Sequence, residues 1–210
     1  MPRSSAAVLV VAHGVDDAAP TTIHTLGQIG EALLATATPW QIRLLTPAAR
    51  DRMAADRAGI KRHLAELADQ DLVTLLIGLA GYATEVGGDP ALVTGPDHRA
   101  LPDEATLPLG WIRDHLRACR AQRVVVIASL AAPGRHLRGG PDRAWLDALG
   151  TARPAHLIAV EPSGPRGIAL AALRDGLSGA AVDPQTGTIT LRSLGAHLAQ
   201  LGGMLLQPSE

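Results

Sequence analysis

Residues 71–79, DLVTLLIGL, and residues 123–129, RVVVIAS, are the two stretches that decide the fold. Each is a short and nearly continuous apolar run, which is typical of a strand buried on both faces of a parallel sheet. The run AAVLVVA at 6–12 has the same character, and two further strands are predicted at 40–46 and 155–160. Five buried strands of this kind require helices to cover them.

Helical periodicity fills the intervals between these strands. Apolar residues recur three or four apart over residues 22–36 and 54–69, as on the buried face of a helix. In the first helix this face comprises Ile23, Leu26, Ile29, Leu33 and Leu34, with Thr21 or Thr22 as the cap. Helices are predicted over residues 22–36, 54–69, 108–121 and 166–178, with a last helix beginning near Ser193.

Alternation of strands and helices predicts parallel βαβ units. We therefore expect residues 1–210 to form a single α/β domain. Its mostly parallel central sheet should have about six strands, with helices on both faces in three layers. A hairpin with arms 82–86 and 91–94 is predicted after the third strand, and a turn at 183–187 should precede a short last strand at 188–191.

Composition narrows the classes of function. The net charge is -1 and the sequence pI is about 6.7, which argues against a nucleic-acid-binding surface. Cys119 is the only cysteine, so neither an internal disulfide nor a multi-cysteine zinc site is expected. The apolar run before His13 is too short to cross a membrane and lacks a cleavage site, so we expect a cytoplasmic protein without a membrane partner.

The glycine-rich segment GLAGYATEVGG at 78–88 matches neither phosphate-binding glycine motif, so no nucleotide site and no cofactor are expected. Functional groups of open α/β sheets lie at the carboxyl ends of the strands. The residues after the first, third and fourth strands are therefore the candidates.

Around these strand ends the chain resembles the caspase-like peptidases. Residues 71–83, DLVTLLIGLAGYA, are similar to the family's strand that ends in Gly-His-Gly, and ALVTGPD at 91–97 is similar to its continuation. Residues 123–134, RVVVIASLAAPG, resemble the strand that carries the nucleophilic cysteine, and 168–199 resemble the closing helix, turn, strand and helix. The resemblance covers roughly residues 6–200 and implies a caspase-like fold.

The same resemblance implies that the catalytic pair is replaced. Tyr82 stands at the position of the general-base histidine, with Ala83 for the glycine after it. Ala131 stands at the position of the nucleophilic cysteine, and Ser129 stands where an acidic residue is common. Alanine has no nucleophile, and tyrosine, with a pKa of about 10, is a poor base at neutral pH. Loss of a nucleophile typically costs on the order of 10⁶ in rate, so we interpret the chain as a pseudo-protease.

Two alternatives remain open. One is a hydrolase with displaced chemistry, in which Ser129 is paired with a loop histidine among His98, His136 and His156, although no G-x-S-x-G motif surrounds the serine. The other is a protein that binds a metal or a small molecule through His13 with Asp16 close by. Its Ala-His-Gly resembles the opening of sirohydrochlorin-type chelatases.

A degenerate enzyme fold implies a binding, scaffolding or regulatory role, an inference by analogy. The partner is expected to be an active caspase-like protease or a signalling protein. A homodimer through the last strand is a further expectation, since an exposed strand edge can pair with another chain. Tyr82 either fills the emptied pocket or anchors a ligand.

Overall fold

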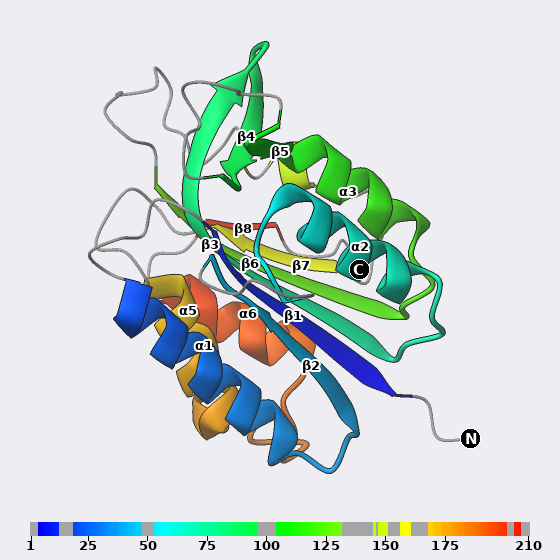
Figure 1. Ribbon diagram of the computed structural model, residues 1–210. Coiled ribbons are helices and arrows are strands. Elements are labelled where there is room, and N and C mark those ends of the chain that lie inside the picture. Colours follow the sequence, from blue (N-terminus) through cyan, green and yellow to red (C-terminus); the bar gives the residue numbers. More distant parts are fainter. Residues whose placement is uncertain are drawn as a thin grey trace.

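The structure of the chain is a computed structural model (Figure 1). It describes residues 4–12, 19–47, 53–95, 104–131, 145, 147–150, 156–160, 168–200 and 204–206. The candidate site residues His13 and Asp16, and the loop histidines His98 and His136, lie outside these ranges.

Among the described residues, the main sheet has six strands in the order β2-β1-β3-β6-β7-β8. All neighbouring pairs are parallel except β7 with β8. The predicted fold class, an α/β fold with a mostly parallel sheet of about six strands, is therefore confirmed. The strands are β1 Ser5–Val11, β2 Trp40–Leu45, β3 Thr74–Val86, β6 Arg123–Ala131, β7 His156–Val160 and β8 Met204–Leu206.

Helices cover both faces of this sheet, which gives the three predicted layers (Figure 1). Alternate side chains of β1, β3 and β6 pack into two separate apolar clusters. One cluster lies under α2 Arg57–Ala68 and α3 Leu109–Ala118. The other lies under α1 Ala19–Leu34, α5 Ile168–Asp175 and α6 Leu191–Gln200. A short π-helical turn, η1 Gly176–Ala180, follows α5 directly.

A smaller antiparallel unit extends from the third strand (Figure 1). β3 continues beyond the main sheet to pair with β4 Asp89–Val93, which in turn pairs with β5 Thr106–Pro108. Gly87 and Gly88 form the turn with φ values of 62° and 92°, a conformation that favours glycine. The predicted hairpin is thus confirmed, but its first arm is a continuation of β3 rather than a separate strand.

Several sequence-based expectations are wrong in detail. Leu34 is 65% exposed, so it does not belong to the buried face of α1. Neither Thr21 nor Thr22 caps this helix, because α1 already begins at Ala19. The predicted last strand at 188–191 is reduced to a single bridge between Ile189 and Val182, because Thr190 caps α6 through hydrogen bonds with Ser193.

The strand that ends the described chain is β8, which runs antiparallel to β7. Its three residues follow a helix and gave no periodic signal in the sequence. β5 was also missed, because it is a three-residue strand within a stretch rich in proline and aspartate.

Candidate functional site: the ends of β3 and β6

The two strands that carry the family resemblance are direct neighbours in the sheet. β3 and β6 pair in parallel over nine residues, from Thr74 opposite Arg123 to Tyr82 opposite Ala131. The backbone therefore brings together the two positions that the resemblance assigns to the histidine and the cysteine. Ser129 lies two residues earlier on β6, opposite Ala80.

The environment of Ser129 is that of a core residue. It is 8% exposed. Ile127, two residues earlier on β6, belongs to the cluster beneath α1, α5 and α6, whereas Leu130, the next residue, belongs to the opposite cluster. Because side chains alternate along a strand, Ser129 faces the same side as Ile127. Tyr82 is half-buried and lies where the pairing of β3 with β6 stops, before β3 continues to Val86. We call this point the ends of β3 and β6.

The remaining thiol and one of the histidines lie far from this strand end. Cys119 ends α3 and is 1% exposed, ahead of the beginning of β6. His156 pairs with Val124 at the beginning of β6. Five residues of strand separate Val124 from Ser129, which corresponds to roughly 16 Å at about 3.3 Å per residue. His156 therefore cannot be the loop histidine that activates Ser129.

The metal-binding alternative depends on residues outside the described ranges. Within those ranges, no group of three or more His, Cys, Asp or Glu side chains could hold a metal ion. His13 and Asp16 are not described, so their role stays a prediction. The test is metal binding by the purified chain, which His13→Ala should weaken if this alternative holds.

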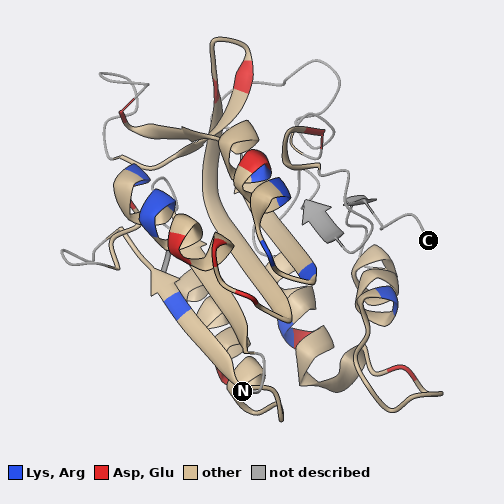
Figure 2. Cartoon of the chain, turned by 90° about the vertical axis from the view of Figure 1, so that its right-hand side faces the viewer, with Lys and Arg blue, Asp and Glu red and all other residues tan. Residues whose placement is uncertain are grey.

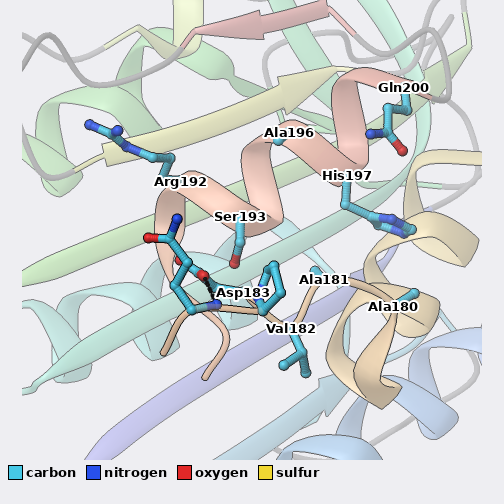
Figure 3. Close-up of a pocket in the computed structure, with 11 residues that line it drawn as sticks. Ala180, Ala181, Val182, Asp183, Arg192, Ser193, Ala196, His197 and Gln200 are labelled. Carbon is cyan, nitrogen blue, oxygen red and sulfur yellow. Dashed lines mark hydrogen bonds between the residues drawn. The ribbon is translucent and has the colours of Figure 1, made fainter. Parts of the chain in front are cut away.

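An open pocket of about 500 Å³ lies elsewhere, between α6 and the turn that precedes it (Figure 3). Its polar lining comes from Asp183 and Gln185 of the turn and from Arg192, Ser193 and His197 of α6. Sequence reasoning treated this turn as a plain connection. The only signal was the polar stretch DPQTGT at 183–188, which is equally typical of a solvent-exposed turn.

Several polar groups of this pocket form hydrogen bonds within the turn or at the start of α6. Asp183 Oδ1 accepts the backbone N–H of Gln185 at 2.8 Å, and Ser193 is held by Thr190. His197 Nε2 is buried with no hydrogen-bond partner among the described residues. Its neighbour in the ring, Cδ2, lies against Gly176. Because Nε2 is buried whereas the pocket is open, this nitrogen faces the protein rather than the pocket.

A charged cluster joins β2 to α2. Arg43 Nη1 donates hydrogen bonds to Glu66 Oε2 at 2.6 Å and to His63 Nδ1 at 2.8 Å. A guanidinium can only donate, so Nδ1 of His63 must accept. The hydrogen bond and the charge of Arg43 lower the pKa of Glu66 below its ordinary value of 4.5. The arrangement fixes α2 against the second strand.

Charges of both signs are interspersed over the described elements, mostly on helices and turns (Figure 2). Pairs of adjacent opposite charges, such as Arg113 with Asp114 and Arg174 with Asp175, are typical of this surface. No helix in the described part of the chain has the length and apolar character needed to cross a membrane.

Comparison with known proteins gives little information about this chain. No family model matches the chain, and no curated protein matches its sequence. Among solved structures, the crystal structure of the Drosophila initiator caspase Dronc is similar, with a TM-score of 0.39 and 8% sequence identity. The match covers 75% of this chain and 54% of that chain, so the chain spans about half of the solved structure's length. A likeness at this level leaves the function to be argued from the residues themselves.

Proposed function

We propose that this chain is a non-catalytic domain of caspase-like type that acts by binding a protein at the ends of β3 and β6. One observation carries the proposal. The two paired strands, TLLIGLAGYATEV and RVVVIASLA, contain neither cysteine nor histidine, and Tyr82 pairs with Ala131 where the resemblance requires the catalytic pair.

The side chains at these positions argue against thiol proteolysis. A thiol peptidase needs a thiolate and a base within hydrogen-bond reach of each other. Cys119 is buried beyond the opposite end of β6, so it cannot take the nucleophile's place. Ser129 is nearly enclosed, which hinders approach of a peptide carbonyl to its hydroxyl.

A strand end without catalytic groups can still bind another protein. Tyr82 offers a half-buried aromatic ring with a hydroxyl, a residue type that is enriched at protein interfaces. The partner that we propose is an active caspase-like protease or a signalling protein. The homodimer expected through the predicted last strand at 188–191 is not part of this proposal, because that stretch forms only a bridge between Ile189 and Val182.

Covalent labelling tests whether the chain has a reactive cysteine or serine nucleophile. The purified chain should be incubated with a thiol-directed peptide chloromethyl ketone and with a serine-directed fluorophosphonate, and its intact mass then measured. We expect no adduct from either reagent, because Cys119 and Ser129 are both buried. A fluorophosphonate adduct that disappears in Ser129→Ala would favour the displaced hydrolase instead.

Two variants make the labelling result interpretable. Ala131→Cys introduces a thiol at the strand end, and its labelling by the chloromethyl ketone reports whether the reagent reaches this site. Tyr82→Ala should weaken binding of any partner that docks there while leaving the fold intact, as judged by circular dichroism. Unchanged affinity of the Tyr82→Ala variant would contradict binding at the ends of β3 and β6.

A further inference from the structure

Packing of α2 against α3 brings an aromatic stack and a cation together. The two helices lie side by side on one face of the sheet (Figure 1). On α3, the rings of Trp111 and His115 stack with their centroids 3.5 Å apart. From α2, Nζ of Lys61 lies 4.8 Å from the centroid of the Trp111 ring, a cation–π contact. We call these three side chains the α2–α3 cluster.

Backbone hydrogen bonding fixes the stack. His115 Nδ1 lies 3.1 Å from the carbonyl oxygen of Trp111, one helical turn earlier. A carbonyl can only accept, so Nδ1 carries a proton and donates it. The imidazole is thereby held to its own helix, and the indole is held between this ring and the Lys61 side chain. The cluster is therefore preorganised rather than assembled from mobile side chains.

Two donors of the cluster are available to a partner. Within the described part of the chain, neither the indole N–H of Trp111 nor the ammonium of Lys61 has a hydrogen-bond acceptor or a carboxylate partner. Both side chains are half-buried, and neither of these nitrogen atoms is enclosed by the protein. An indole N–H and an ammonium can only donate, so the group that satisfies them must be an acceptor.

The carboxylates of the two helices do not supply that acceptor. α2 and α3 each contain one carboxylate, Glu66 and Asp114. Glu66 is bound by Arg43 at 2.6 Å, and Asp114 is bound by Arg113 at 2.9 Å. Lys61 therefore keeps a positive charge that no neighbour compensates among the described residues.

Small side chains leave the cluster open to a ligand. Residues three or four positions apart on a helix are neighbours on its surface. Ala58 and Ala65 flank Lys61 in this way on α2, and Ala118 follows His115 on α3. All three alanines are exposed, so no long side chain at these positions covers the stack.

We propose that the α2–α3 cluster binds a carboxylate side chain from an acidic segment of another protein. The Lys61 ammonium and the Trp111 indole N–H donate to the carboxylate, and the methylene groups that carry it pack on the indole and on the flanking alanines. Tryptophan in such a setting is typical of the residues that dominate protein interfaces. This surface is separate from the ends of β3 and β6, and the inference does not depend on the proposed function.

The charges around the cluster favour a single carboxylate over a nucleic acid. Asp69 at the end of α2 and Asp114 on α3 are exposed on the same side of the molecule and would repel an extended row of phosphates. The chain as a whole has a net charge of -1, whereas nucleic-acid-binding surfaces are strongly basic. One carboxylate needs only the two donors that the cluster provides.

Nuclear magnetic resonance of the indole N–H groups tests this site directly. The chain has three tryptophans, and the signal lost in Trp111→Phe identifies Trp111. A short glutamate-rich peptide should shift this signal saturably and leave that of Trp40 unchanged, because Trp40 already donates its N–H to Thr36. The control peptide carries glutamine at each glutamate position and should shift neither. An unmoved Trp111 signal, or equal shifts with the two peptides, would overturn the proposal.

Substitution of Lys61, the only lysine of the chain, separates its charge from its packing. Lys61→Gln should raise the dissociation constant of the glutamate-rich peptide about three- to tenfold, whereas Lys61→Arg should preserve the affinity. The control, Arg192→Gln, removes an exposed cation from α6 on the opposite face of the sheet and should have no effect. Unchanged affinity of Lys61→Gln would contradict the assignment. So would a single-stranded oligonucleotide that shifts the Trp111 signal at lower concentration than the peptide.

Discussion

The centre of the main sheet and its β2 edge are built from similar residues but do different things. In β1, and over residues 75–81 of β3 and 124–130 of β6, both faces are buried, so these stretches are enclosed by the two apolar clusters. In β2 only Leu45 is fully buried, and one face carries Gln41 and Arg43. The comparison teaches that burial on both faces fixes the fold, whereas the edge strand β2 keeps polar and partly exposed side chains on the face that meets α2.

The test with the largest expected effect compares alanine substitutions of two isoleucines, one in β3 and one in β2. Ile77→Ala in β3 removes a side chain with no exposed surface and should lower the free energy of unfolding by about 2–5 kcal/mol. Ile42→Ala in β2 should cost clearly less, because its side chain is half-buried already. Urea denaturation of both variants at low protein concentration measures the difference. Equal losses would mean that the edge is as much a part of the core as the centre.

The segment that closes the end of the β2 edge provides the second test. Gly59 lies in the first turn of α2, so close to residues 53–55 that an added Cβ would lie less than 3 Å from the carbonyl oxygen of Ala54. We expect Gly59→Ala to destabilise the fold by about 1–3 kcal/mol through overpacking. The matched control is Gly27→Ala in α1, which meets nothing within 4 Å and should gain up to about 1 kcal/mol from helix propensity. A neutral Gly59→Ala would contradict the tight contact.

The smallest expected effect concerns the ion pair between β2 and α2. Arg43 lowers the pKa of Glu66, so the pair stabilises the fold above the ordinary value of 4.5 and loses this contribution as the pH falls through the lowered pKa. Glu66→Gln should therefore be slightly less stable than the unmodified chain at pH 7. The difference should vanish under acidic conditions. Thermal unfolding of both chains across this pH range measures the difference in stability. A difference that grows on acidification would show that the ion pair does not stabilise the fold through a lowered pKa of Glu66.

Periodicity in the sequence predicted the long elements and their layering. Strands such as β1 and β6 are continuous apolar runs, which is typical of strands buried on both faces of a parallel sheet. The short strands β5 and β8 gave no such signal, because three residues carry no period. Leu34 was misplaced for a related reason, since helical spacing alone does not show where a sheet beneath the helix ends.

Positions of the candidate site could be predicted only in part. The resemblance assigns Tyr82 and Ala131 to the two positions of one catalytic pair, and the structure pairs them across β3 and β6. Burial of Ser129 could not be anticipated, because it depends on helices distant in the sequence that pack over β6. The pocket beside α6 was also missed, since its lining comes from a turn whose sequence is typical of solvent-exposed loops.

Peptide hydrolysis by the purified full chain is the most direct test of the central claim that the ends of β3 and β6 perform no chemistry. A fluorogenic peptide library should be assayed with the unmodified chain and with Ser129→Ala as the matched control. The account predicts that both chains hydrolyse every peptide at the rate seen in buffer alone. Saturable hydrolysis by the unmodified chain that is lost in Ser129→Ala would contradict it.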